Sequence, residues 1–192
     1  MLTFKPTSGQ TDCAPFDLAL AGGQRRPLTV PHPASYAQLA RVVAKSFRRL
    51  LTKAGRSKCA RSKPVYSAAG ERALRSSVKP ANLSRERAIV RGGARYLVKA
   101  DIAQFYPSLY THAIGWAIDS SLRSPPFKQP KNLGFEIDKG VSALQGRETH
   151  GIPIGNDISF LLAEVVLGAV DRALKLKKCV FRPIVNARIG PS

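Results

Sequence analysis

The sequence predicts one α+β domain, and three observations support this class. The chain has 192 residues, of which 44% are hydrophobic, so it is long enough to bury a single core. Apolar residues recur at helical spacing over residues 35–53 and again after residue 157. Residues 96–102 instead form a compact apolar run, which is typical of a buried strand. The pattern therefore predicts helices packed with a small sheet.

The N-terminal part is expected to pass from irregular chain through an extended segment into a helix. Residues 1–24 mix Pro, Gly, Thr and Gln without periodicity, which predicts a loosely ordered lead-in. Arg25–Pro33 reads RRPLTVPHP, and each proline biases its predecessor away from helix, so a short strand or polyproline-like stretch is expected. An amphipathic helix should follow, capped by Ser35 and continuing to Lys53.

The middle of the chain predicts basic loops, a strand and a helix. Residues 55–95 are rich in Ser, Gly and Arg, and we expect loop and short strand there, with a short helix near residues 70–74. Tyr96–Ile102 should be a buried strand that ends beside a lone acid. A helix from Ser108 to Leu122 should follow it, and two prolines then end that helix.

The C-terminal part predicts a turn that leads into a long buried helix. Residues 127–150 are expected to be a loop-rich insert. The stretch GIPIGNDIS at residues 151–159 should form a tight turn, with Asn156 or Asp157 capping the helix that runs to about Lys178. Residues 179–192 predict an irregular tail.

Composition excludes several classes of protein. The longest apolar run, residues 160–170, contains Glu164 and is too short to cross a bilayer, and no signal peptide is visible. The three cysteines lack the spacing of a zinc site or of a disulfide framework. These features predict a cytoplasmic protein with no membrane partner.

The positive charge is concentrated in one part of the chain. The formal net charge is +19, and residues 41–99 carry 17 Lys or Arg against two acids, Glu71 and Glu86. Such a distribution favours a polyanionic partner, of which nucleic acid is the commonest. The alternative is a solvated basic surface that maintains solubility.

Motif searches leave one carboxylate as the leading candidate for chemistry. The sequence has no phosphate-binding loop, no nucleophile elbow and no His-Glu-x-x-His motif, and its three histidines are far apart in the chain. Asp101 is expected at the end of a buried strand, where a carboxylate must be paired or must hold a cation. Beside a basic region that cation would be Mg²⁺ shared with phosphates, and Tyr106 would lie next to it. The alternative is that Asp101 caps the next helix and Tyr106 packs in the core.

Two stretches resemble the palm motifs of reverse transcriptases. Lys99–Leu109, which reads KADIAQFYPSL, resembles the first catalytic motif, D-[IL]-x-x-[FY]-[FY]-x-[ST]-[IL]. About 50 residues later, GIPIG at residues 151–155 and the following helix resemble the second motif, in which a Gly-Pro turn supports the template and the incoming nucleotide. Arg25–Pro33 resembles a fingers segment of bacterial members, R-x-[IL]-x-[IV]-P-x-P. The sequence of Ser108–Ile118 and the GIPIG turn are more similar to bacterial reverse transcriptases linked with phage defence than to retroviral or group II intron enzymes.

The resemblance implies a right-hand polymerase fold with fingers, a partial palm and no thumb. Residues 1–24 would precede the fingers, residues 25–95 would form a basic fingers-like region, and residues 96–178 would form the partial palm. Residues 179–192 would be a truncated tail. The implied function is RNA-directed DNA synthesis by two-metal-ion nucleotidyl transfer on an RNA template, a DNA primer and a dNTP.

The resemblance also implies roles for individual residues. Asp101 would be the catalytic, metal-binding aspartate, and the Ile102 carbonyl oxygen would be a further Mg²⁺ ligand. Tyr106 would pack against the sugar and exclude a 2′-hydroxyl. Arg25 and Arg26 would contact the triphosphate or the template backbone, with a generic basic surface as the alternative. The turn residues that would support the substrate are Gly151, Pro153 and Gly155.

One family motif is missing from this sequence. The third palm motif, a hairpin that reads roughly [FY]-x-D-D, should follow the helix of the second motif, but no two acidic residues are adjacent anywhere in the 192 residues. One carboxylate does not fix two metal ions. We therefore expect an incomplete chain that is inactive by itself. The alternative function is a noncatalytic, basic nucleic-acid-binding module in which Asp101 is structural.

Overall fold

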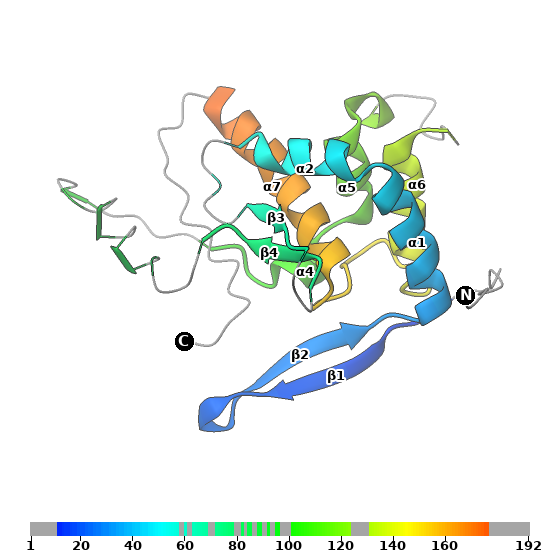
Figure 1. Cartoon of the computed structure of the whole chain (residues 1–192), viewed down its shortest axis with the longest axis horizontal. Helices are drawn as coiled ribbons and strands as arrows, with labels where there is room; N and C mark the ends of the chain where they lie inside the picture. Colours follow the sequence, from blue (N-terminus) through cyan, green and yellow to red (C-terminus); the bar gives the residue numbers. More distant parts are fainter. Residues whose placement is uncertain are drawn as a thin grey trace.

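The computed structural model describes residues 11–57, 60, 63–68, 72–78, 82, 84–85, 88–89, 92, 95–96, 101–123 and 131–176. Within these residues the fold is α+β, which confirms the predicted class. Helices make up most of the body, and two antiparallel hairpins, one longer than the other, accompany them (Figure 1). The predicted tail, residues 179–192, lies outside the described residues.

A long hairpin lies at the N-terminal end. Strands β1 (Ala14–Ala19) and β2 (Arg25–Val30) pair antiparallel with Phe16 opposite Leu28, and the short 3₁₀ helix η1 (Ala21–Gly23) joins them. The hairpin extends away from the helical body (Figure 1). The expected strand at Arg25–Pro33 is confirmed, but the loosely ordered lead-in is wrong for the described residues after Cys13. The missed feature is a two-glycine turn, Gly22 at φ 80° and Gly23 at φ 76°, which closes the hairpin.

Two helices replace the single helix expected after Ser35. Helix α1 (Pro33–Lys45) and helix α2 (Phe47–Gly55) are separated at Ser46, whose backbone leaves the helical region at φ −113° and ψ 14°. Ser35 does not cap α1, because the helix begins earlier, at Pro33, where a missing N–H costs nothing. Ser35 is instead buried and accepts a hydrogen bond from the Thr11 hydroxyl at 2.9 Å.

The second hairpin comes from the basic region. Strands β3 (Pro64–Tyr66) and β4 (Leu74–Ser76) pair antiparallel, with Tyr66 opposite Leu74. The short strand expected in residues 55–95 is therefore confirmed. The short helix expected near residues 70–74 is wrong at Leu74, which begins a strand and is buried; residues 70 and 71 lie outside the described residues.

Three short elements replace the helix expected over Ser108–Leu122. They are α4 (Phe105–Ser108), α5 (Thr111–Ile118) and the 3₁₀ helix η2 (Ser120–Arg123). The break between α4 and α5 has a clear cause, because Leu109 and Tyr110 are extended and Tyr110 forms an antiparallel bridge with His150.

Helix α6 (Leu133–Ala143) occupies the region expected to be a loop-rich insert, so that expectation is wrong. The side chain of Asn132 caps the helix by accepting a hydrogen bond from Gly134 N at 2.8 Å. At its start α6 crosses α5 at two glycines: a Cβ on Gly134 would lie 2.6 Å from the Gly115 carbonyl oxygen. This close approach explains why a residue of low helix propensity stands in the first turn.

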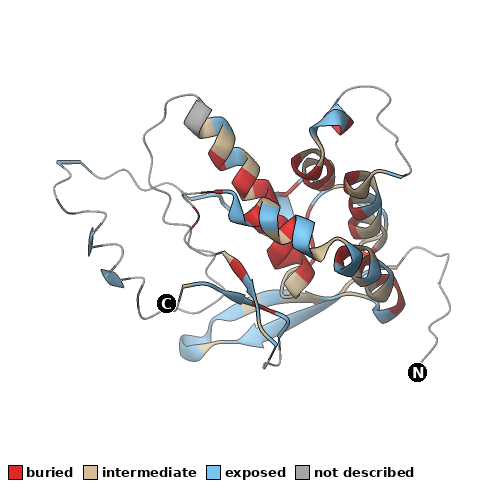
Figure 2. Ribbon diagram, turned by 45° about the horizontal axis from the view of Figure 1, so that its top comes forward, coloured by how far each residue is buried: buried red, intermediate tan, exposed pale blue. Residues whose placement is uncertain are grey.

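Helix α7 (Asp157–Leu176) is the centre of the core, as the sequence predicted. Its residues 158–166 are buried throughout, and α2 and α5 pack against it (Figure 2). Of the described residues, those in helices form no segment with both the length and the apolar character that a bilayer crossing needs.

Candidate functional site

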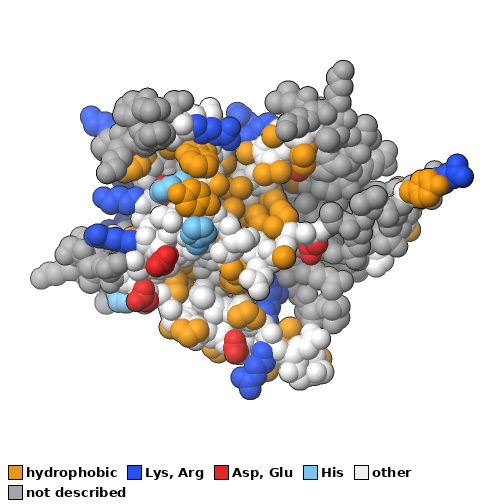
Figure 3. Space-filling model, turned by 180° about the vertical axis from the view of Figure 1, so that it is seen from behind, with side chains coloured by type: hydrophobic (Ala, Val, Ile, Leu, Met, Phe, Trp, Pro, Cys, Tyr) orange, Lys and Arg blue, Asp and Glu red, His pale blue; other side chains and the backbone are white. Residues whose placement is uncertain are grey.

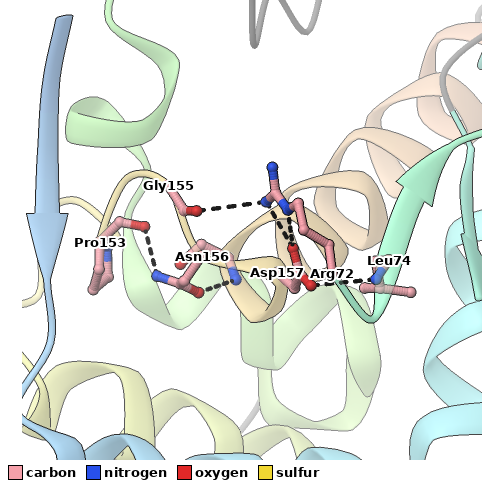
Figure 4. A network of polar contacts seen from close by, with 7 residues as sticks. Arg72, Leu74, Pro153, Gly155, Asn156 and Asp157 are labelled. Carbon is pink, nitrogen blue, oxygen red and sulfur yellow. Dashed lines mark hydrogen bonds and ion pairs between the residues drawn. The ribbon is translucent and has the colours of Figure 1, made fainter. Parts of the chain in front are cut away.

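The candidate site is built around the turn that precedes α7, as drawn in Figure 4. Gly151 at φ 82° and Gly155 at φ 109° take backbone conformations that favour glycine. Asn156 ties the turn to the helix, because its Nδ2 donates to the Pro153 carbonyl at 3.1 Å and its Oδ1 accepts from Ser159 N at 2.8 Å. Asn156 is thus the helix cap, which was one of the two residues expected there.

The segment around Tyr106 lies directly against this turn. Ile152 N donates to the Tyr106 carbonyl at 3.0 Å, and Gly151 N donates to the Leu109 carbonyl at 2.8 Å. A Cβ on Gly151 would lie 3.2 Å from the Pro107 carbonyl oxygen, so the approach is close. The two stretches that resemble palm motifs are therefore in contact.

Strand β2 reaches the other side of the same turn. Thr29 N donates to the Ile154 carbonyl at 3.0 Å, and Ile154 N donates to the Thr29 hydroxyl at 2.7 Å. A Cβ on Gly155 would lie 3.3 Å from a methyl group of Leu28. Because Arg25 and Arg26 belong to β2, the turn brings the strand that carries them to the site; Arg25 is exposed and Arg26 is half-buried.

Arg72 also lies at the turn, and sequence reasoning did not single it out. Its Nε and Nη2 donate to one oxygen of Asp157 at 2.9 and 2.6 Å, and Nη2 lies 3.5 Å from the Gly155 carbonyl oxygen (Figure 4). The other Asp157 oxygen accepts from Leu74 N at 3.2 Å. Asp157 therefore joins the β3–β4 hairpin to the first turn of α7, where a carboxylate is favoured by the helix dipole. No local signal distinguishes Arg72 from the other basic residues of its region.

Two titratable groups at the site are shifted from their ordinary values. Burial and the charge of Glu164 raise the pKa of the Tyr106 hydroxyl to about 12, against the opposing effect of Arg26 and Arg72. Burial, followed by the charge of Asp171, raises the pKa of Glu164 to about 7. At neutral pH Tyr106 thus keeps its proton and can donate a hydrogen bond, while burial favours the protonated form of Glu164 more than that of a free carboxyl group.

Asp101 differs from the sequence-based expectation. Asp101 and Ile102 are exposed and lie outside any strand, and Tyr96 at the start of the predicted strand is 80% exposed; residues 97–100 lie outside the described residues. The expected burial of the Asp101 carboxylate is therefore wrong, and desolvation does not force it to hold a cation. One carboxylate oxygen accepts from Ile102 N at 2.9 Å, and the exposed carboxylate remains open to a further ligand.

The oxygen donors at Asp101 are of the kind that Mg²⁺ takes in proteins. Mg²⁺ is commonly held by one or two carboxylates together with substrate phosphates, and the Asp101 carboxylate with the Ile102 carbonyl oxygen supplies the protein part of such a set. Over the part of the chain that the structure describes, no three His, Cys, Asp or Glu side chains gather as a metal cage.

Comparison with known proteins adds no relative. No family model matches the sequence, and no curated protein is significantly similar to it.

Proposed function

We propose that this chain is a reverse-transcriptase-like fingers and partial palm that binds nucleic acid and a deoxynucleoside triphosphate. One observation carries the proposal. Three segments that resemble separate family motifs meet at the turn before α7, through hydrogen bonds of Ile154 with Thr29 and of Ile152 with Tyr106. Thr29 and Ile154 are 125 residues apart in the sequence, so the fold brings these segments together.

Residues on the segments that meet at this junction have the chemistry that nucleotide binding needs. Asp101 and the Ile102 carbonyl oxygen would hold one Mg²⁺, which supplies charge neutralisation for the triphosphate when bound. Tyr106, protonated at neutral pH, would lie against the sugar. The guanidinium groups of Arg25 and Arg26 would bind phosphate oxygens of the nucleotide, the RNA template or the DNA primer.

Nucleotide binding, and not polymerisation, is the activity expected of these 192 residues alone. In-line nucleotidyl transfer uses two metal ions, one at the attacking oxygen and one at the leaving oxygen. Asp101 is the single carboxylate that the resemblance assigns to metal binding, and the sequence has no adjacent pair of acids.

The test is Mg²⁺-dependent binding of dTTP, measured by calorimetry for the wild-type chain and for Asp101→Asn. The substitution keeps an oxygen that accepts from Ile102 N but removes the charge that holds the cation, so we expect binding to weaken at least about tenfold. Asp17→Asn, an exposed carboxylate on β1, is the matched control and should bind normally. Equal Mg²⁺ and dTTP binding by both variants would refute the proposal.

A second candidate function is a noncatalytic nucleic-acid-binding module. The exposure of Asp101 and its bond to the neighbouring amide favour a local, structural role for this residue. The two candidates share a steep loss of nucleic-acid affinity with salt, because both depend on the basic residues. They differ in dTTP binding, which the second candidate does not include at any Mg²⁺ concentration.

A further inference from the structure

Four aromatic side chains, Tyr110, His112, Trp116 and His150, meet at the surface, and we call them the ring cluster. The ring centroid of Tyr110 lies 4.8 Å from His112, 6.0 Å from Trp116 and 5.5 Å from His150. The rings are accessible, since Tyr110 is 36% exposed, 42% of the His112 side chain is exposed and His150 is exposed. Figure 3 shows histidines beside hydrophobic side chains on this face, with Asp and Glu side chains next to them and Lys and Arg side chains at the border.

The ring cluster is held in place by the backbone and by a third element. Tyr110 and His150 face each other across an antiparallel bridge, and Thr111 N donates to the Thr149 carbonyl at 2.8 Å. The Nδ1 of His112 lies 2.5 Å from a carboxylate oxygen of Asp138 in α6. Rings fixed in this way lose little freedom when a flat ligand stacks on them, so binding carries a small entropic cost.

Two exposed basic residues, Arg147 and Lys139, lie close in the sequence to residues of the ring cluster or to its partner Asp138. Arg147 is exposed and lies three residues before His150. At the maximum extension of the chain, the Cα atoms of these two residues are about 10 Å apart. It stands at φ 65°, where glycine would be less strained, so the local backbone does not explain an arginine there. Lys139, which follows Asp138, is also exposed. The exposed acids Glu136 and Glu148 also lie in this part of the chain, so the attraction for a polyanion comes from the net charge of +19 of the whole chain, with Arg147 and Lys139 as local phosphate contacts.

Aromatic faces beside cations are the combination that binds single-stranded nucleic acid. Unpaired bases stack on aromatic rings, whereas a duplex keeps its bases stacked on one another. We propose that the ring cluster binds unpaired bases of a single strand by stacking, while Arg147 and Lys139 contact the phosphates on either side. This inference rests on the proposed function only in that the chain binds nucleic acid. Because His150 directly precedes Gly151, the bound strand would lie next to the candidate site.

The fluorescence of Trp116 reports on this contact, because Trp116 is the single tryptophan of the chain. Titration with a 12-nucleotide oligouridine at low salt should quench Trp116 fluorescence to a plateau. An abasic strand of equal length and charge should bind more weakly and leave the fluorescence unchanged. Quenching by the abasic strand equal to that by oligouridine would overturn the proposal, as would the absence of quenching by oligouridine.

Substitutions test the individual rings. Tyr110→Leu and His150→Leu should each weaken oligouridine binding about 5- to 150-fold, the range for loss of one base–aromatic stack. Tyr66→Leu, at a tyrosine that is 59% exposed on β3, is the matched control and should change affinity less than twofold. His150→Leu serves as the second variant if Tyr110→Leu does not fold. Affinities of both ring variants equal to that of the control would refute stacking and leave this face to a protein partner.

The two proposals fail separately. If the ring cluster is correct, Asp101→Asn keeps the oligouridine quench, and the ring variants keep Mg²⁺-dependent dTTP binding. A ring variant that lost dTTP binding as strongly as strand binding would contradict a separate stacking surface.

Discussion

Replacement of Gly151 by alanine should damage both the stability and the geometry of the candidate site. At φ 82° an alanine carries the left-handed penalty of about 1–2 kcal/mol. Its Cβ would also lie 3.2 Å from the Pro107 carbonyl oxygen, a backbone atom that cannot move aside as a flexible side chain does, which adds about 1–3 kcal/mol of overpacking. We expect the free energy of unfolding to fall by about 2–5 kcal/mol in total.

Gly22 provides the matched control. Its φ of 80° is nearly the same, but nothing lies within 4 Å of the position that its Cβ would occupy. Gly22→Ala therefore carries the conformational penalty alone, about 1–2 kcal/mol. Urea unfolding of both variants, fitted with the same dependence of the free energy of unfolding on urea concentration, measures the difference in their stability. If Gly151→Ala destabilises the protein no more than Gly22→Ala does, then the close packing of the turn on Pro107 is wrong.

Three further expectations test the rest of the structure. Gly134→Ala should lower stability by about 1–3 kcal/mol through overpacking, whereas Gly55→Ala, which has open space around its Cβ, should be neutral or stabilising in thermal melts. The folded-state pKa of Glu164 is raised to about 7, so its ionisation destabilises the fold. Relative to Glu164→Gln, the free energy of unfolding of the wild type should fall by about 3 kcal/mol as pH rises from 4.5 to above 7. Parallel stability–pH curves of the two proteins would contradict the burial of Glu164. Arg72→Ala should cost about 1 kcal/mol or less in urea unfolding, because its ion pair with Asp157 is partly solvated, and a loss above about 3 kcal/mol would contradict that exposure.

Local patterns predicted those elements whose stabilising contacts are local. Helix α7 was predicted almost to its ends, because its apolar run and its cap at Asn156 are both visible in the sequence. Helix α6 was missed, although Asn132 and the spacing of Ile137 and Val141 are helical signals. Its two glycines, Gly134 and Gly140, weaken the pattern, and both have tertiary reasons: Gly115 lies against one, and Leu39 against the other.

Contacts between segments that are far apart in the sequence were harder to predict. Strand β1 was missed because Ala14–Ala19 has little alternation of its own and is held by its register with β2. The junction of the Tyr106 segment with the turn at Gly151 was expected only through the family resemblance. Arg72 was not expected at all, because its partner Asp157 is 85 residues away and no spacing rule connects them.

Two hydrogen bonds between Thr29 and Ile154 attach the N-terminal hairpin to the turn before α7. The hairpin extends away from the helical body and exposes Phe16 and Leu18 to solvent, where another molecule can bind. These hydrogen bonds attach the hairpin to Ile154. Two residues earlier in the turn, Ile152 N donates a hydrogen bond to the Tyr106 carbonyl oxygen. The hairpin and the Tyr106 backbone are therefore both attached, by hydrogen bonds, to the same three residues of the turn, 152–154.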